Sequence, residues 1–426
     1  MNASSRLAIV NIGQLATLAA PPGQSGPRIG AAMREPGLIA DAAVLVEDGI
    51  IRAVGRYTDL RSWIDDDCQV IDAGRRLVTP GFVDAHTHLV FAGNRAAEYE
   101  QRIAGATYQQ IAAAGGGIQS TVTLTRQASE EALLAQARRH RNWMLRGGTT
   151  TLEAKSGYGL NTESELRLLR VLSQLNREGP VRIVSTLLAA HTVPGEYASD
   201  RDAYIQSILD ELLPAVASEK LARYCDAFCD DHAFTVEETR RVLTAARQHG
   251  LGLRIHAEQF RPGTGAALAA ELGAATADHL ETIDDETIGA LVRADVQPVL
   301  LPASVFCLSR TQYPPARRMI DSGLAVVLAT DFNPGSAPAP SMAFTLSLAC
   351  LQMRMTPAEA LTAATINAAH SLGLGSEIGS LEPGKCADLL LHEIDDYREL
   401  AYFAAAPLRP RVFLAGREIT RYEVRP

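Results

Sequence analysis

Eight apolar, strand-like runs alternate with helical patterns through the middle of this 426-residue chain. Alternation of this kind predicts a parallel sheet whose strands are joined by helical crossovers. Eight such strands are the number that closes a (β/α)8 barrel. The runs cover residues 78–88, 149–157, 182–192, 221–229, 252–258, 274–280, 296–303 and 324–332. We therefore predict an α/β protein built on a TIM-like (β/α)8 barrel.

Helix start signals lie between these runs and support the alternation. A Ser or Thr followed three residues later by Glu is typical of a capping box, in which each side chain bonds the other residue's backbone N–H. We assign capping boxes to the pairs Thr162/Glu165, Thr235/Glu238 and Thr356/Glu359, each at the start of a helical pattern. Pro357 stands at the first position of the third helix, where proline is favoured.

Both ends of the chain have β character. Strand-like segments and turn residues occur at residues 7–18, 43–55, 379–392 and 411–420. Asp48-Gly49 is a tight-hairpin signal. Neither end has enough strands to be stable alone, so we expect the two ends to pair and cover each other's edges. The predicted division is a composite β-sandwich domain of residues 1–75 and 380–426, and a barrel of residues 76–379.

Composition limits the partners. A formal net charge of −9 and the lack of any Lys/Arg-rich block argue against a nucleic-acid or anionic-membrane surface, so we expect a small-molecule substrate. No apolar run reaches the roughly 18 residues of a membrane span. The six scattered cysteines indicate reduced thiols, and we expect a cytoplasmic protein. The neighbours Cys225, Cys229, Asp230, Asp231 and His232 lack a CxxC pair, so we do not assign zinc to them.

Residues of types that commonly bind metal ions lie at the ends of several of the eight strand-like runs. His86 and His88 are two residues apart, so on a strand both side chains point to the same face. His256 ends the fifth run and Asp331 the eighth. In a closed barrel these positions meet at the C-terminal mouth. Three imidazoles and a carboxylate suit Zn²⁺ or iron, so we predict one Zn²⁺ or Fe²⁺/Fe³⁺ ion per subunit.

The same residues indicate hydrolysis. A metal with an open coordination position acidifies a bound water and polarises a carbonyl. We expect Asp331 to accept the water proton and His279, at the end of the sixth run, to stabilise or protonate the tetrahedral centre. A second ion bound by His279 would need a lysine ending the fourth run. The fourth run contains no lysine, and Lys155 ends the second run instead. We therefore favour one ion and expect Lys155 to pack or form an ion pair.

Three local strings add a family resemblance that covers nearly the whole chain. They are residues 115–118 with 120–121, residues 155–159, and residues 331–336. With the ligand set, they resemble the amidohydrolase superfamily and, within it, the imidazolonepropionase family. The resemblance implies hydrolysis of 4-imidazolone-5-propanoate to N-formimidoyl-L-glutamate in histidine degradation. It also implies a homodimer.

The resemblance also suggests substrate contacts. Arg95, in the first loop after a strand, can hold the substrate carboxylate through two parallel hydrogen bonds. Tyr158 and His191 match family contacts to the carboxylate or the ring, and Tyr108 is a weaker candidate.

Four further polar or small residues complete the predicted pocket. Gln259 stands where the family can carry a glutamate. Because an amide cannot act as a base, we expect Gln259 to bind the ring and its neighbour Glu258 to be structural. Asn333, Gly335 and Ser336 follow the eighth run and are expected to hold the amino-acid-like end of the product.

Two other readings stay open. The same metal, His279 and Asp331 can also expel ammonia from a purine, pyrimidine or related ring, but a neutral ring has no use for Arg95. A barrel that serves as a scaffold after losing its metal would lack ligands that this chain retains. The residues do not decide between zinc and iron.

Overall fold

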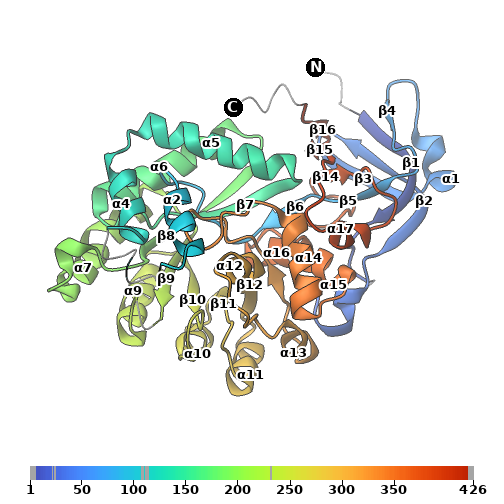
Figure 1. The fold of residues 1–426 in the computed structure, drawn as a ribbon. Coiled ribbons are helices and arrows are strands. Elements are labelled where there is room, and N and C mark those ends of the chain that lie inside the picture. The colour runs from blue at the N-terminus through green and yellow to red at the C-terminus, as the bar shows by residue number, and fades with distance from the viewer. Residues whose placement is uncertain are drawn as a thin grey trace.

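The computed structural model describes residues 6–21, 23, 25–106, 110, 115–230 and 233–420. Two sheets organise it. One is a parallel barrel with helices on its outside, and the other is a mixed sheet that combines both ends of the chain (Figure 1). The first and last strands of the chain, blue and red in the figure, therefore lie in the same sheet.

Eight parallel strands pair in chain order around the barrel. They are β6 (Phe82–Asp84), β7 (Thr149–Lys155), β8 (Arg182–Ala190), β9 (Tyr224–Cys229), β10 (Gly252–Ala257), β11 (Thr276–His279), β12 (Gln297–Leu300) and β13 (Val327–Leu328). Each predicted run contains one of them, so the predicted fold is confirmed. Their residues are almost all buried, as expected for a sheet covered on both faces.

Backbone bonds beyond the first and last strands close the barrel. The Asp331 N–H donates to the His86 carbonyl at 3.1 Å, and the His88 N–H donates to the Phe332 carbonyl at 2.9 Å. Closure therefore places the His-X-His segment directly beside Asp331, although the two are far apart in sequence.

Helices surround the barrel strands. They are α2 (Ala96–Ile103), α4 (Ile118–Gln127), α5 (Glu130–Arg146), α6 (Thr162–Glu178), α7 (Arg201–Ser207), α8 (Leu213–Glu219), α9 (Val236–Gln248), α10 (Gly265–Glu271), α11 (Asp285–Ala294), α12 (Pro302–Cys307), α13 (Ala316–Asp321), α14 (Met342–Met353), α15 (Pro357–Ala363) and α16 (Ile366–Ser371). The longer ones are amphipathic; α6, for example, buries Leu168, Leu172 and Leu175 at helical spacing. No helix in the described part of the chain has the length and apolar character to cross a bilayer.

Two of the three predicted capping boxes are confirmed, those of Thr235 with Glu238 and of Thr356 with Glu359. The third prediction is wrong, because Asn161 rather than Thr162 caps α6. The Asn161 side chain accepts the Ser164 N–H at 2.8 Å, which leaves Glu165 free for another role described below.

The second sheet contains strands from both ends of the chain. These are β1 (Arg6–Ala16), β2 (Leu38–Glu47), β3 (Ile50–Arg56), β4 (Gln69–Asp72), β5 (Leu77–Pro80), β14 (Leu389–Leu391), β15 (Arg411–Leu414) and β16 (Arg417–Glu418). One apolar cluster joins Ile9 and Val44 to Leu389 and Phe413, so the two ends share a core. Short helices α1 (Tyr57–Leu60) and α17 (Glu399–Tyr402) lie near this sheet.

Two glycines of this region occupy positions with little room for a side chain or with an unusual backbone conformation. In the β2–β3 hairpin Asp48 and Gly49 both have positive φ, 48° and 81°, as the predicted tight turn requires. The first predicted run is divided between the two sheets, because β5 pairs with β1 and β14 whereas β6 begins the barrel. Gly81 lies at this division, where a Cβ would be 2.2 Å from the Thr150 hydroxyl oxygen.

Candidate active site

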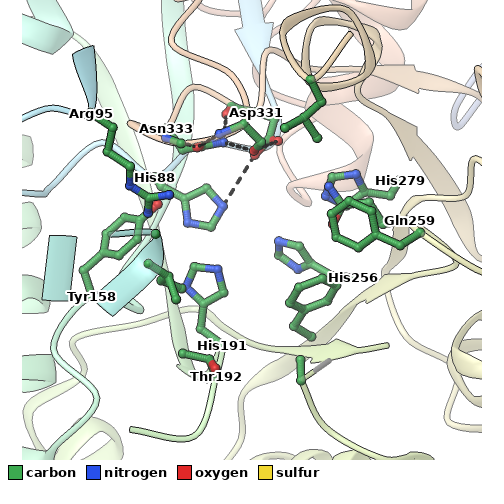
Figure 2. A pocket seen from close by; sticks show the side chains of 18 of the residues that line it. His88, Arg95, Tyr158, His191, Thr192, His256, Gln259, His279, Asp331 and Asn333 are labelled. Carbon is green, nitrogen blue, oxygen red and sulfur yellow. Dashed lines mark hydrogen bonds and ion pairs between the residues drawn. The ribbon is translucent and has the colours of Figure 1, made fainter. Parts of the chain in front are cut away.

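A cavity of about 920 Å³ opens at the C-terminal ends of the barrel strands, where barrel enzymes place their chemistry. Figure 2 shows its walls: Arg95, Tyr158 and His191 lie on one side, His256, Gln259 and His279 on the other, and Asp331 with Asn333 between them. The residues predicted for catalysis and substrate binding that line it are Arg95, Tyr158, His191, Gln259, His279, Asp331, Asn333, Gly335 and Ser336. His88 and His256 line it as well, and His86 is fully buried beside them.

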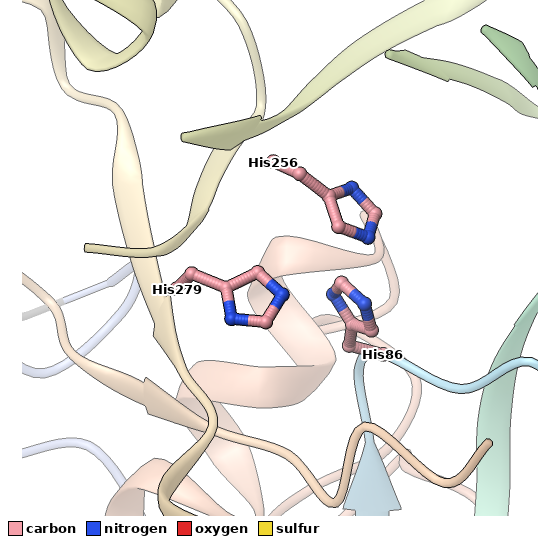
Figure 3. A group of neighbouring side chains, drawn as sticks. All are labelled: His86, His256 and His279. Carbon is pink, nitrogen blue, oxygen red and sulfur yellow. The ribbon is translucent and has the colours of Figure 1, made fainter. Parts of the chain in front are cut away.

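The nitrogen and oxygen donors fall into two overlapping groups. In each group, the candidate ligand atoms lie within 4.8 Å of one another. His86, His88 and Asp331 form one group, and His86, His256 and His279 form the other, whose rings converge in Figure 3. His279 therefore lies at ligand distance as well as at the cavity wall.

These donors fit a metal ion. The Nε2 atoms of His86 and His256 are buried and have no hydrogen-bond partner in the described structure. A buried nitrogen without a hydrogen-bond partner destabilises the fold unless another group, such as a metal ion, binds its lone pair. Burial lowers the pKa of His86 and of His88 well below the ordinary value, and the positive charge of Lys155 adds to the effect at His86. Both imidazoles are therefore neutral, which is the form that binds a metal.

Carboxylates on the inner side of the site orient the imidazoles. The Nδ1 atom of His86 lies 2.6 Å from Asp278 Oδ2, and that of His256 lies 3.0 Å from Asp226 Oδ1. Each contact leaves Nε2 facing the metal position, the usual arrangement for a ligating histidine. Sequence reasoning missed Asp226 and Asp278 in this role. The available signal was a charged residue inside an otherwise apolar strand run.

Glu281 stands in the same relation to His279. Its Oε1 lies 3.3 Å from His279 Nδ1, and both side chains are buried. Burial alone would lower the pKa of His279, but the charge and hydrogen bond of Glu281 outweigh it and raise that pKa. Glu281 is a further residue that the sequence analysis missed.

Lys155 lies under the histidines in the barrel interior. Its Nζ is 2.8 Å from Asp226 Oδ2 and 2.9 Å from Glu153 Oε1, so the predicted ion-pair role is confirmed. Burial would lower the pKa of Lys155, but these two carboxylates raise it above the ordinary lysine value. Lys155 therefore carries a charge in the barrel core.

Asp331 occupies a strained position between the two groups of donors. Its φ is 55°, a left-handed value that few residues other than glycine adopt. Its Oδ1 lies 3.5 Å from the Nε2 atoms of both His86 and His88. Burial raises the pKa of Asp331, although His279 and His256 oppose that shift.

Arg95 is held by the wall opposite Gln259. The Arg95 Nε donates to the Thr121 hydroxyl at 2.8 Å, which leaves the terminal nitrogens of the guanidinium on the cavity side. Gly335 packs against them, and a Cβ at that position would lie 2.4 Å from Arg95 Nη1. The absence of a side chain at Gly335 therefore leaves room for the Arg95 guanidinium.

Tyr158 and His191 form a neighbouring patch of the wall. The rings of His191 and His88 stack with their centroids 5.3 Å apart, and the ring centroids of Tyr158 and His191 are 5.4 Å apart. His191 Nδ1 donates to the Gly157 carbonyl at 2.9 Å. Burial lowers the pKa of His191 to about 3, so its ring is neutral and its Nε2 is an acceptor toward the cavity.

The loop after β13 is held by the Asn333 side chain. Its Nδ2 donates to the Asp331 carbonyl at 2.7 Å and to the Ser336 hydroxyl at 2.8 Å, and its Oδ1 accepts the N–H groups of Gly335 and Ser336. The Ser336 hydroxyl in turn donates to Asp331 Oδ2 at 3.3 Å. The amide of Asn333 is thus used within its own loop.

The remaining predictions for this region have mixed outcomes. Glu258 is structural, as predicted, since it accepts the Ala266 N–H at 3.0 Å. Its neighbour Gln259 lines the cavity. Tyr108, Asp231 and His232 lie outside the described residues.

Comparison with known proteins gives this geometry a family. The sequence pattern of the amidohydrolase family matches residues 77–418. The imidazolonepropionase of Solibacter usitatus is 57% identical over 414 residues, which cover 97% of this chain and 98% of that protein. The chain belongs to the imidazolonepropionase family. A second relative, the imidazolonepropionase of Brevibacillus brevis, is 47% identical and covers 91% of this chain and 92% of its own.

Solved structures share the fold at lower identity. An adenosine deaminase from Xanthomonas campestris with bound zinc matches with a TM-score of 0.70 at 20% identity and covers 97% of this chain and 92% of its own. A 5-methylcytosine deaminase from Klebsiella pneumoniae matches with a TM-score of 0.72 at 17% identity, with 97% of each chain covered. The fold of this chain is therefore shared with solved proteins that are named for different reactions.

Proposed function

We propose that this imidazolonepropionase-family protein hydrolyses the cyclic amide of 4-imidazolone-5-propanoate to N-formimidoyl-L-glutamate, the histidine-degradation step of the family. One observation carries the proposal beyond the family name. The cavity places a cluster of imidazoles and a carboxylate at its base and a tethered guanidinium on its wall. A cyclic amide with a carboxylate arm needs both.

We propose His86, His88, His256 and Asp331 as the ligands of one metal ion per subunit, Zn²⁺ or iron. The unpartnered Nε2 atoms of His86 and His256 support this assignment. A metal held there supplies Lewis-acid chemistry: it acidifies a water towards neutrality and polarises the carbonyl oxygen.

Asp331 and His279 are the proposed proton-handling groups. Asp331 can ligate the ion through one carboxylate oxygen and accept the proton of an attacking water through the other. The imidazole of His279 lies on the side of the cavity that holds His256 and Gln259, with Glu281 behind its Nδ1, so its Nε2 can hydrogen-bond the oxygen on which negative charge develops. Water adds to the ring carbonyl carbon, the carbon–nitrogen bond breaks, and the ring nitrogen takes the proton.

The remaining wall residues are proposed to bind and orient the substrate. Arg95 holds the propanoate carboxylate through its terminal nitrogens. Tyr158 and His191 contact the carboxylate or the ring from the same side, and Gln259 contacts the ring from the other. The loop that contains Asn333, Gly335 and Ser336 forms the end wall, where it shapes the product site beside Asp331.

We further propose that the protein is a cytoplasmic homodimer. All six cysteines are free thiols, which fits a reducing compartment. Exposed Phe306, Leu351 and Tyr402 lie on α12, α14 and α17, and α14 contacts both of the other helices, so these side chains offer an apolar surface for a second copy. Light scattering at several concentrations tests the dimer, and a strictly monomeric mass would contradict it.

The decisive experiment follows the loss of 4-imidazolone-5-propanoate with metal-loaded protein, with chelator-treated protein, and after Zn²⁺ or Fe²⁺ is restored. We expect conversion to N-formimidoyl-L-glutamate that disappears with the metal and returns with it. Turnover of a purine or pyrimidine ring by the loaded protein, without turnover of the imidazolone, would favour the deaminase reading instead.

A further inference from the structure

The interior of the barrel below the histidines contains charged side chains where aliphatic layers usually pack. Glu153, Lys155, Asp226, Arg254 and Asp278 are each 0% exposed. They come from β7, β9, β10 and β11, so the layer crosses the barrel. Barrel interiors are normally filled by branched aliphatic residues. Because burying charges is expensive, five of them in one layer call for a role beyond packing.

Lys155 is the centre of this layer. Its Nζ lies 2.8 Å from Asp226 Oδ2 and 3.8 Å from Asp278 Oδ2. The other oxygen of Asp226 contacts His256 Nδ1, and Asp278 Oδ2 contacts His86 Nδ1. One lysine therefore stands behind two separate carboxylate–histidine pairs.

Arg254 and Glu153 complete the layer, and their hydrogen bonds in the described structure are to carbonyl, carboxylate, backbone N–H and lysine groups rather than to an imidazole. Arg254 Nη2 donates to the Ala85 carbonyl at 2.8 Å, just before His86, and lies 3.5 Å from Asp278 Oδ2. Glu153 lies 2.9 Å from Lys155 and its other oxygen accepts the Thr87 N–H at 3.3 Å. Three of the five groups are carboxyl groups and two are basic side chains.

We propose that Lys155 is a positioning residue for the metal site. By holding Asp226 and Asp278 it fixes the imidazoles of His256 and His86, so that both Nε2 atoms face one point (Figure 3). The proposal rests on the metal site of the proposed function, but not on its substrate or reaction. A lysine on β7 thus sets the geometry of ligands that belong to β10 and to the segment after β6.

The first test replaces Lys155 by methionine, which keeps the length of the side chain and removes its charge. Zn²⁺ affinity is measured by competition with a coloured chelator, and folding is followed by circular dichroism. We expect a folded protein that binds Zn²⁺ about 10–100-fold more weakly, the range found when groups behind metal ligands are removed. Lys220→Met is the matched control, because Lys220 is exposed at the end of α8. Wild-type affinity in Lys155→Met would overturn the proposal.

A second variant separates positioning from simple neutralisation. The double change Lys155→Met with Glu153→Gln removes one positive and one negative charge, so the charge balance of the layer is kept. Its Asp226 and Asp278 nevertheless lose their common anchor. We expect weak Zn²⁺ binding in the double variant, together with altered visible absorption of bound Co²⁺. Recovery of wild-type affinity and spectrum would overturn the proposal, because the lysine would then have acted only as a counter-charge.

If Lys155→Met does not fold, the double variant replaces it as the test, because it leaves no additional uncompensated charge in the core.

The proposed function and the proposed role of Lys155 are contradicted by different results. Wild-type protein that binds Zn²⁺ tightly but does not turn over the imidazolone would contradict the proposed function and leave the role of Lys155 intact. Turnover together with unchanged metal affinity in both Lys155 variants would contradict only the role of Lys155.

Discussion

The carboxylate of Glu165 accepts the backbone N–H of Gly157 at 3.0 Å. It also accepts the N–H groups of Gly159 and Leu160, at 2.7 Å and 2.8 Å. The first turn of α6 therefore shapes the loop that holds Tyr158, and the Gly157 carbonyl of the same loop orients His191. Glu165, which the sequence pattern assigns to a helix cap, therefore supports one wall of the substrate cavity instead.

Glu165→Gln tests this wall. An amide offers one acceptor oxygen to three N–H groups, and its own NH₂ faces one of them. A buried donor left unsatisfied costs about 1–3 kcal/mol, so we expect KM to rise about tenfold or more as Tyr158 and His191 shift. KM and kcat for the imidazolone are the measurement. Glu163→Gln, on the exposed face of the same turn, is the control. Equal KM values for both variants would contradict the assignment.

Arg95→Ala is expected to weaken binding of the substrate carboxylate. Loss of a charge-assisted hydrogen bond costs about 1.5–3 kcal/mol, so kcat/KM should fall about 10–100-fold. An imidazolone without the propanoate arm is the matched control, because it has no group for Arg95 to hold. The difference between wild type and variant should vanish with that compound. A large loss with both compounds would show that Arg95 acts on the ring or the fold.

Gly335→Ala should affect the same guanidinium from the other side. The new Cβ would lie 2.4 Å from Arg95 Nη1, the end of a flexible side chain that can move away. We therefore expect KM to rise with little change in melting temperature. Gly195→Ala is the control, since a Cβ there meets nothing within 4 Å. Unchanged KM in Gly335→Ala would mean that Arg95 binds the carboxylate equally well from a displaced position.

Glu359→Gln is expected to show a pH-dependent loss of stability. Burial alone would raise the pKa of Glu359, but Arg317, the Thr356 N–H and Arg34 lower it from 4.5 to about 2. Because the folded-state pKa is depressed, the stabilisation is present above the unfolded-state value of 4.5 and is lost as the pH falls towards 2. At neutral pH we expect the free energy of unfolding of the variant to be about 2 kcal/mol lower than that of the wild type.

The measurement for Glu359 is the difference in melting temperature between wild type and variant across that acidic range. The difference should narrow as the pH falls. Glu219→Gln is the control, since the Glu219–Arg170 pair is solvent-exposed and such pairs contribute little. If the difference in melting temperature between wild type and Glu359→Gln stays constant with pH, the shape of the Glu359 side chain rather than its charge stabilises the fold.

Local sequence patterns were sufficient to predict the barrel architecture and most of the candidate metal-ligating residues. Strand-like runs of buried residues, helix start signals and the Asp48-Gly49 turn depend on neighbours along the chain, and the structure contains all of them except the Thr162 box. His86, His88, His256 and Asp331 could be found because parallel strands carry their ends to one face of a barrel.

Tertiary structure decided what each buried polar group contacts. Asp226 and Asp278 stand in apolar runs with nothing nearby in sequence to assign them to His256 and His86, and Lys155 meets them only across the barrel. Likewise the division of the first run between two sheets depends on strands from both chain ends. The physical reason is the same in each case. A buried charge or donor must be satisfied by whichever group the closed fold brings within about 3 Å, and sequence spacing carries no record of that distance.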